Sequence, residues 1–422
     1  MLTEREHIGI FGKMNSGKSS LMNLLTQQET SITDSTPGTT ADVKIALQEI
    51  HGLGPVKFFD TAGLDEGTLL GAKKREKVMN VLKECDLILL VIDPSTRIFE
   101  SENEILDEAR ELDKQILIVY NLFEKSDNKF LNELEMQIPL LKFIPSITLS
   151  AIDASFRQSL LNFIINNYDP KFQKTDLLPF VEKDQFYVLN IPMDEETPPG
   201  RYLRPQAMAE EYITRNWAFP VSYRMNLGVA RSENPQPEKD RFDAFLNSLG
   251  RRPKAIITDS QAMDIMAKWT PPDIMLTTFS IMMINYVSKG RISEFYEGIK
   301  ALDNLQPGDK ILIAEACNHS RINEDIGTVQ IPRKINQLFP GVIVDHNFGR
   351  EFQSNSELEK YKLIIHCGGC MISHQKLQAR LRDLRHVGVP VTNYGVFLSW
   401  MQGQAALERV MEPWRKESKC YQ

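Results

Sequence analysis

The segment that most constrains this fold is a glycine-rich loop close to the N-terminus. An apolar run over residues 7–11 leads into Gly12-Lys-Met-Asn-Ser-Gly17-Lys18-Ser19, and a helical pattern follows over residues 20–25. This is the G-x-x-x-x-G-K-S motif in the strand–loop–helix context that a phosphate-binding loop requires. Its glycines let backbone N–H groups close around phosphates, and the helix N-terminus adds positive potential. The sequence therefore predicts an α/β nucleotide-binding domain at the start of the chain.

Three later stretches occur in the order that a GTPase needs. Gly38-Thr39-Thr40 can give a threonine to Mg²⁺, and Asp60-Thr-Ala-Gly63 follows an apolar strand over residues 56–59. We expect Asp60 to hold a Mg²⁺-bound water and the Gly63 N–H to meet the γ-phosphate. Ser150-Ala151 ends another strand and is expected to touch the base through its backbone. Together with the phosphate loop, these motifs resemble the TrmE–Era group of small GTPases over residues 1–168.

The residues expected at the nucleotide share one task, which is to hold GTP and its Mg²⁺. They are Gly12, Asn15, Ser16, Gly17, Lys18, Ser19, Ser20, Thr39, Thr40, Asp60, Gly63, Asn121, Glu124, Ser150 and Ala151. Mg²⁺ is expected beside Ser19, Thr40 and Asp60, and Lys18 is expected to reach the β- and γ-phosphates. The predicted catalytic residues are Asn15, Lys18, Thr40 and Gly63.

Two positions depart from the GTPase pattern. The guanine-reading motif N-K-x-D is replaced by Asn121-Leu-Phe-Glu124 after the strand over residues 115–120. GTP is the expected nucleotide, and ATP use stays open. Leu64 stands where Ras-type enzymes place a water-orienting glutamine. Asn15 resembles the P-loop asparagine of GTPases that use K⁺ in place of an arginine finger. The alternative is that Asn15 only tightens the loop.

The middle of the chain alternates strands and helices. Strand-like runs occur at residues 186–192, 221–225, 255–258 and 274–277, between helical patterns at 205–216, 239–249 and 260–268. This rhythm predicts a small parallel sheet. Arg201, Arg204 and Glu210 are interpreted as a solvated face. Because an open sheet edge has to be covered, we expect homodimerisation through residues 180–278.

Three cysteines gather in the last third of the chain. Cys317-Asn-His319 follows an apolar strand over residues 310–314, and His366-Cys367-Gly-Gly-Cys370 follows a second strand over residues 362–365. Ligands bind outside the carboxyl ends of parallel strands, so the three thiols are expected at one sheet edge. A closed zinc tetrahedron, a three-thiolate iron–sulfur cluster and three inert buried cysteines are the alternatives. The C-G-G-C turn disfavours inert cysteines, since its glycines let the backbone wrap a site.

The elements expected around these cysteines form another α/β pattern. Further strands are predicted over residues 342–345 and 389–392, with helices over 280–305, 333–338 and 375–387. Two cysteines lie apart from the thiol group: Cys85 is expected in the core, and Cys420 as a frayed thiol near the chain end. Cysteines paired with histidines favour metal chemistry in a reducing cytosol over a disulfide framework.

Composition excludes several classes of partner. The net charge is -7 and the pI about 5.7, with no basic run, which argues against binding to nucleic acid or to a membrane surface. The first residues carry no apolar signal region, and the apolar runs are too short to span a bilayer. A cytoplasmic protein is therefore expected.

The whole pattern resembles the HydF family, the maturation GTPases of [FeFe]-hydrogenases. The GTPase motifs, the middle α/β pattern and the C-x-H and H-C-G-G-C motifs carry the resemblance. It implies a [4Fe-4S] cluster held by Cys317, Cys367 and Cys370, and a scaffold role for a transient diiron subcluster precursor. It also implies the radical-SAM maturases HydE and HydG and the hydrogenase HydA as partners. A displaceable fourth ligand is expected from His319 or Glu324, while His366 is expected to point away.

The sequence thus predicts an α/β protein of three domains. These are a P-loop GTPase domain over residues 1–168, a small parallel α/β dimerisation domain over 180–278 and a cluster-binding α/β domain over 279–415. The predicted function is that of a GTP-hydrolysing iron–sulfur scaffold or carrier in [FeFe]-hydrogenase maturation. Two alternatives are a TrmE-like RNA-modification GTPase with a structural zinc site, which the acidic pI disfavours, and a nucleotide-gated adaptor without meaningful turnover, which Leu64 allows.

Overall fold

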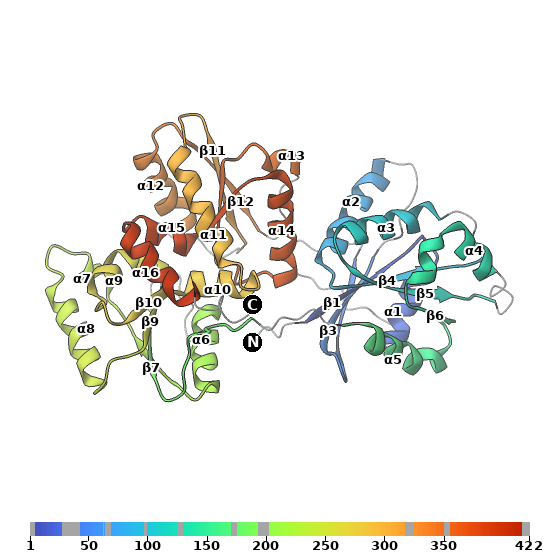
Figure 1. The fold of residues 1–422 in the computed structure, drawn as a ribbon, viewed down its shortest axis with the longest axis horizontal. Helices are drawn as coiled ribbons and strands as arrows, with labels where there is room; N and C mark the ends of the chain where they lie inside the picture. The colour runs from blue at the N-terminus through green and yellow to red at the C-terminus, as the bar shows by residue number, and fades with distance from the viewer. Residues whose placement is uncertain are drawn as a thin grey trace. The chain divides into compact units, whose positions relative to one another are not determined.

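The computed structural model divides the chain into two compact units, Met1–Phe172 and Gln173–Gln422. It describes residues 5–27, 43–61, 63, 69–96, 99–124, 130–169, 175–192, 202–316, 325–349 and 355–415. Each unit is an α/β structure built around parallel strands (Figure 1). The predicted fold class is confirmed, including the P-loop domain at the start of the chain.

A six-stranded sheet organises the first unit, in the order β2-β3-β1-β4-β5-β6. All neighbouring strands are parallel except β2 and β3. The strands are β1 (Glu6–Phe11), β2 (Lys44–Ile50), β3 (Gly54–Asp60), β4 (Leu87–Ile92), β5 (Gln115–Asn121) and β6 (Ser146–Leu149). The helices are α1 (Lys18–Thr26), α2 (Leu69–Glu84), α3 (Glu100–Glu111), α4 (Leu131–Gln137) and α5 (Arg157–Asn167).

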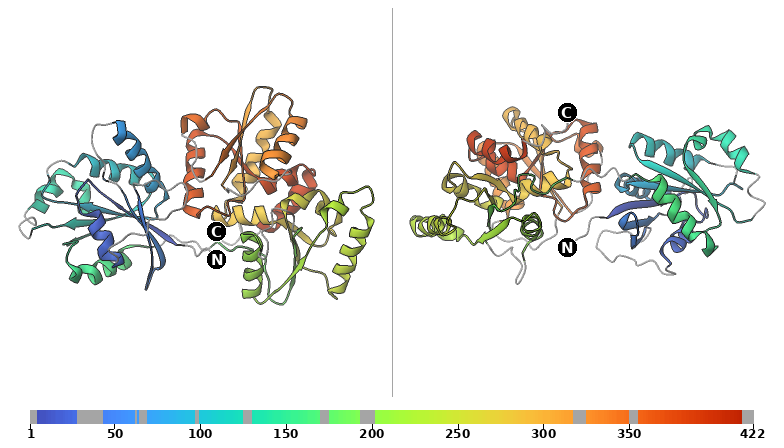
Figure 2. Two further views of the ribbon diagram at one scale, coloured as in Figure 1. Left: turned by 180° about the vertical axis from the view of Figure 1, so that it is seen from behind. Right: turned by 60° about the horizontal axis from the view of Figure 1, so that its bottom comes forward.

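Helices cover both faces of this sheet, and the central strand β4 shows why. Every residue of β4 is buried. Leu87, Leu89 and Val91 join the core beneath α1 and α5, whereas Ile88, Leu90 and Ile92 join the core beneath α2, α3 and α4. Successive side chains of a strand point to opposite faces, so a continuous apolar run is what a strand between two helical layers requires. Figure 2 shows the two layers from further directions.

The second unit contains two four-stranded parallel sheets, ordered β10-β9-β7-β8 and β12-β11-β13-β14. The first is made of β7 (Phe186–Asn190), β8 (Phe219–Tyr223), β9 (Ala255–Thr258) and β10 (Met275–Thr278). The second is made of β11 (Lys310–Glu315), β12 (Ile343–Phe348), β13 (Leu363–His366) and β14 (Val391–Asn393).

The helices of the second unit pack around both sheets. They are α6 (Arg204–Arg215), α7 (Leu227–Ala230), α8 (Gln236–Ser248), α9 (Met263–Trp269), α10 (Phe279–Val287), α11 (Ile292–Gly298), α12 (Ile331–Leu338), α13 (Asn355–Leu358), α14 (His374–Val387), α15 (Tyr394–Trp400) and α16 (Gln404–Arg415). One helix was expected over residues 280–305. The structure instead has α10, α11 and a 3₁₀ turn (Ile299–Asn304), because Lys289 and Gly290 have φ of 57° and 81° and end the first helix.

One hydrophobic core joins the two sheets of the second unit, running from Leu177 to Trp414. The last described helix, α16, follows the second sheet in the chain yet packs on β10 of the first. Trp414 Nε1 donates to Thr277 Oγ1 at 2.9 Å, and the Arg409 guanidinium donates to the carbonyls of Thr270 and Ile274 at 3.0 and 2.8 Å. The expected boundary between residues 278 and 279 therefore lies inside a shared core.

Within the part of the chain that the structure describes, no helix is both long and apolar enough to cross a membrane.

Candidate nucleotide and thiol sites

The phosphate loop has the backbone conformation that its glycines predict. Gly12 and Gly17 have φ of 145° and 98°, and Asn15 also has a positive φ of 64°. A Cβ atom on Gly17 would lie 2.1 Å from Asn121 Nδ2, so a side chain is excluded there. Lys18 is buried, and its Nζ donates to the carbonyls of Gly12 and Lys13 at 3.1 and 2.7 Å. Lys18 is thus hydrogen-bonded across the phosphate loop, where it is predicted to bind the β- and γ-phosphates.

Two of the predicted Mg²⁺ ligands lie in contact. Ser19 Oγ donates to Asp60 Oδ2 at 2.7 Å, and Asp60 Oδ1 has no hydrogen-bond partner among the described residues. Burial raises the pKa of Asp60, while the Ser19 hydrogen bond and the Lys18 charge act in the opposite direction. A buried carboxylate with a free oxygen beside a hydroxyl fits a hard cation that binds oxygen. These residues fit the predicted Mg²⁺ site.

The segment after β3 lies against the phosphate loop. A Cβ atom on Gly63 would be 2.5 Å from both the backbone nitrogen and the Cα of Met14, so only glycine fits. Thr61 Oγ1 donates to the carbonyl of Ile10 at 2.8 Å and anchors the same segment to β1. This packing brings the backbone of Gly63, predicted to meet the γ-phosphate, next to the loop that would hold it.

Asn121 uses both ends of its amide to join three elements of the first unit. Its Nδ2 donates to the carbonyl of Ser16 at 2.9 Å, and its Oδ1 accepts the backbone N–H of Ala151 at 2.9 Å. The N–H of Ala151, which the sequence assigns to the base, is therefore taken by Asn121 in this structure. Glu124 is exposed, and the neighbouring Phe123 is 52% exposed. The roles predicted for Asn121, Glu124 and Ala151 at the base stay predictions.

A buried carboxylate beneath the phosphate loop was not predicted. Glu102, in the first turn of α3, is 1% exposed, and burial raises its pKa. The backbone N–H groups of Glu102 and Lys13 and the charge of Lys13 act against this rise of the pKa. An acidic residue in the first turn of a helix is usually solvated, so the sequence gives no signal that this one supports the loop.

Several predicted residues lie outside the described part of the chain. They are Thr39 and Thr40 of the switch segment, Leu64, and Cys317, His319 and Glu324 of the thiol group. Among the described residues, no three His, Cys, Asp or Glu side chains are grouped so as to hold a metal. The roles predicted for these positions stay predictions.

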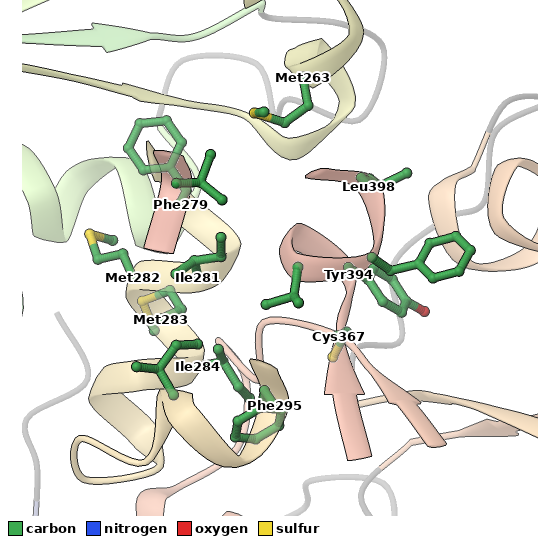
Figure 3. Close-up of a cluster of buried hydrophobic side chains, with 14 of the residues drawn as sticks. Met263, Phe279, Ile281, Met282, Met283, Ile284, Phe295, Cys367, Tyr394 and Leu398 are labelled. Carbon is green, nitrogen blue, oxygen red and sulfur yellow. The ribbon is translucent and has the colours of Figure 1, made fainter. Parts of the chain in front are cut away.

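Cys367 and Cys370 lie at the end of β13, as the strand pattern predicts. Cys367 Sγ accepts the backbone N–H of Ala316, at the end of β11, at 3.3 Å and the N–H of Gly369 at 3.4 Å. Figure 3 shows Cys367 at its strand end, with Tyr394 of α15 beside it. Neither of these two cysteines forms a disulfide with a described residue; Cys367 is buried and Cys370 is partly exposed. Cys85 likewise forms none, and burial in the core raises the pKa of its thiol.

The surroundings of Cys367 and Cys370 fit a thiolate-bound metal group. Two backbone N–H donors on one sulfur stabilise the thiolate form, which is the form that binds metals. Gly369 has φ of 68°, so the turn between the cysteines relies on a glycine. The N–H that bonds Cys367 belongs to Ala316, directly after β11 and one residue before the predicted third thiol. The described residues thus include two of the three predicted cysteine ligands.

Both ring nitrogens of His366 have hydrogen-bond partners. Arg380 Nη1 donates to His366 Nε2 at 2.9 Å, and His366 Nδ1 lies 2.8 Å from the Cys367 carbonyl. Arginine can only donate, so Nε2 is the acceptor and Nδ1 carries the proton. These two hydrogen bonds occupy both ring nitrogens, and the expectation that His366 points away from the cysteines stays a prediction.

Two arginines to which the sequence analysis gave no role at the thiols contact this region. Arg380, 2% exposed in α14, also donates to the carbonyl of Gly349 at 3.1 Å. Arg204, the first residue of α6, donates through Nη1 to the carbonyl of Cys370. The interpretation of Arg204 as part of a solvated face is wrong. Its contact joins residues 166 positions apart, which no local pattern reveals.

Comparisons with known proteins follow the same division of the chain. The model for 50S ribosome-binding GTPases matches residues 7–122. The tRNA modification GTPase MnmE of Desulforamulus reducens is 39% identical over 121 residues, which are 28% of this chain and 26% of that protein. The GTPase Der of Campylobacter concisus is 30% identical over 179 residues, 40% of this chain and 38% of that protein. The chain thus spans less than half the length of these relatives.

A solved structure of Era from Aquifex aeolicus, bound to GDP and AlF4-, is 25% identical to this chain, with a TM-score of 0.33. It covers 40% of this chain and 60% of the Era chain. The remaining matches fall in the second unit: the hydrogen maturase F dimerization domain matches residues 236–290, and the hydrogen maturase F tetramerization domain matches residues 293–413. With both of these domains following a GTPase domain, the chain belongs to the hydrogen maturase F (HydF) family.

Proposed function

We propose that this protein is a GTP-hydrolysing iron–sulfur scaffold that carries the diiron subcluster precursor to an apo-[FeFe]-hydrogenase. The observation that supports the proposal most is the environment of Cys367, whose Sγ accepts backbone N–H groups from both β11 and the C-G-G-C turn. A metal-bound thiolate gains more from two such donors than a neutral thiol does, because hydrogen bonds to a charged acceptor are stronger. The matches to two hydrogen maturase F domains support a role for these thiols in hydrogenase maturation.

The proposed resident group is a [4Fe-4S] cluster. Cys317, Cys367 and Cys370 would hold it, and His319 or Glu324 would give a displaceable fourth ligand. When bound, such a cluster supplies an iron corner that exchanges its ligand. The chain's own contribution is to orient Cys367 through its two N–H donors and to keep His366 occupied by Arg380.

The nucleotide site supports GTP hydrolysis through positioning and charge. Lys18 would leave the carbonyls of Gly12 and Lys13 to reach the phosphates, and Ser19 and Asp60 would exchange their mutual hydrogen bond for Mg²⁺. Gly63 and Thr40 are proposed around the γ-phosphate. Asn15 is proposed to hold K⁺, since its positive φ of 64° places it at the bend of the loop. Bound γ-phosphate would order the switch segments and so bias partner docking.

Self-association and partners complete the proposal. We propose a homodimer formed through the middle sheet, in keeping with the dimerization-domain match over residues 236–290. The tetramerization-domain match over residues 293–413 adds a second level of assembly that the sequence did not predict. HydE and HydG are the proposed suppliers of the precursor, and HydA is the proposed recipient, in the cytoplasm.

Anaerobic purification followed by metal analysis and EPR tests the proposal. About four irons per chain and a cluster signal lost on replacing Cys367 or Cys370 with serine are expected. Cys85→Ser is the matched control, because this thiol is buried in the first unit. GTP turnover measured with K⁺ and with Na⁺ then tests the role of Asn15. Parent protein without iron would contradict the scaffold proposal.

One observation favours a second candidate, an RNA-modification GTPase with a structural zinc. The 39% identity to MnmE over 121 residues is confined to the GTPase domain. Zinc in place of iron in the purified protein, together with RNA binding that resists 200 mM salt, would select this candidate. The two hydrogen maturase F matches favour the first.

A further inference from the structure

Helix α6 begins at the residue that contacts the cysteine loop. The guanidinium of Arg204 donates through Nη1 to the carbonyl of Cys370. The start of the helix is fixed by a capping hydrogen bond, since Gln206 Oε1 accepts the N–H of Leu203 at 3.0 Å and Gln206 is 1% exposed. Pro205 at the next position sets φ for the first turn. The backbone from which the Arg204 side chain extends is therefore fixed.

The same helix belongs to the first sheet of the second unit. It packs on β7, β8 and α10, with Ala209 and Ile213 fully buried in the shared core. Helix α10 in turn lies against the C-G-G-C turn. A Cβ atom on Gly368 would lie 3.5 Å from Ser280, and one on Gly369 would lie 3.4 Å from Val287 Cγ2. The turn is thus held from one side by α10 and from another by Arg204.

We infer that Arg204 is a positioning residue for the turn from Cys367 to Cys370, through which the sheet that carries α6 sets the geometry and charge around the two thiols. A guanidinium is a fixed positive charge with planar donors, so it both anchors a carbonyl and offsets negative charge on nearby thiolates. This inference rests on the proposed function, because the charge matters most when the thiols hold a metal group.

Three variants separate the contributions of Arg204. Arg204→Gln removes the charge and the guanidinium, and Arg204→Lys keeps the charge without the planar donors. Arg215→Gln is the matched control. It removes the same charge from the same helix, about 16 Å away along the helix axis, where the side chain is 75% exposed and pairs with Glu211.

The readouts are iron release to a chelator, the midpoint potential from an EPR redox titration, and Cys370 alkylation by iodoacetamide in iron-free protein. Arg204→Gln is expected to speed iron release and Cys370 alkylation about fivefold, the factor that one lost hydrogen bond gives. It is also expected to lower the midpoint potential. Arg204→Lys is expected to restore the potential but not the release rate.

Equal values for Arg204→Gln and Arg215→Gln in all three readouts would overturn the inference. Urea unfolding of each variant confirms that the second unit is folded. If the parent protein binds no iron, the proposed function fails, but the alkylation rates of the iron-free protein still test the role of Arg204. The two failures are therefore distinguishable.

Discussion

Asn121 illustrates how one side chain of a motif can also connect the loops around it. The amide spans the phosphate loop and the turn after β6, with both hydrogen bonds buried. The N-K-x-D pattern predicts that this asparagine contacts the nucleotide, and the bridge between the two loops is an additional finding. Its partners lie 105 and 30 positions away, which explains why the bridge is not visible in the sequence.

Replacing Asn121 with alanine should therefore weaken both the fold and the nucleotide site. The Ser16 carbonyl and the Ala151 N–H lose their partner, at a cost of about 1–3 kcal/mol for a buried polar group. We expect a lower urea midpoint for the first unit and weaker binding of a fluorescent GTP analogue. Asn162→Ala, at an exposed position of α5, is the control and should change neither measurement.

Glu124 is the residue through which guanine selectivity can be altered. It is exposed at the end of the motif, whereas Asn121 is buried and bridges two loops. The double variant Leu122→Lys with Glu124→Asp restores the full motif, and we expect the GTP-to-ATP preference to rise about tenfold, or about 1.4 kcal/mol. Competition binding measures it. An unchanged ratio would mean that base selection does not depend on this segment.

Asp60→Asn should separate metal binding from folding. Burial raises the pKa of Asp60 in the metal-free fold. The folded carboxyl therefore holds its proton more tightly than the unfolded one, and stability is lost as pH rises from the unfolded pKa through the folded pKa. At pH 7 in EDTA, the neutral asparagine should raise the melting temperature of the first unit. With GDP, the variant should lose the additional stabilisation by Mg²⁺; a response equal to the parent's would contradict this.

At the scale of elements, the two glycines of the C-G-G-C turn make a matched pair. Gly369 has φ of 68°, which costs a residue with a side chain about 1–2 kcal/mol, whereas a Cβ atom on Gly368 meets only ordinary contacts of 3.5–3.7 Å. We expect Gly369→Ala to lower iron retention and the urea midpoint of the second unit, and Gly368→Ala to leave both near the parent values. Equal effects would rule out backbone conformation as the cause.

The sequence predicts elements well where a pattern is continuous. The apolar run of β4 and the P-loop in its strand–loop–helix context define the first unit, and the strand before Cys367 places the thiol at a sheet edge. Other elements depend on single residues or long-range packing. The break at Lys289 and Gly290 is one such case, and the position of β8 is another: it begins at Phe219 because Trp217, with φ of 59°, turns the chain just before it.

At the scale of the whole molecule, each unit has cores of its own, so thermal unfolding is expected in two transitions. GTP with Mg²⁺ should raise only the transition of the first unit, because the ligand binds residues of that unit. Differential scanning calorimetry with and without nucleotide measures this. A single transition that moves as a whole would contradict the independence of the units.

Arg409 tests the shared core of the second unit. Its guanidinium donates to the carbonyls of Thr270, Pro271 and Ile274, at the end of the sheet on which α16 packs. Arg409→Ala should cost about 3 kcal/mol, as for lost hydrogen bonds to a charged group, and lower only the second transition, by about 5–10 °C. Arg415→Ala on the same helix removes an exposed ion pair with Glu408 and should cost less than about 1 kcal/mol.

The return of α16 to β10 also fixes an order of events during synthesis. The GTPase unit can fold as soon as its 172 residues have emerged, since domains fold as units from the N-terminus. The sheet of β7 to β10, by contrast, lacks part of its cover until residue 415 has been made. A nascent chain therefore acquires its nucleotide switch early. We expect the sheet of β7 to β10 and the cysteine turn to mature together in one late step, because they share one core.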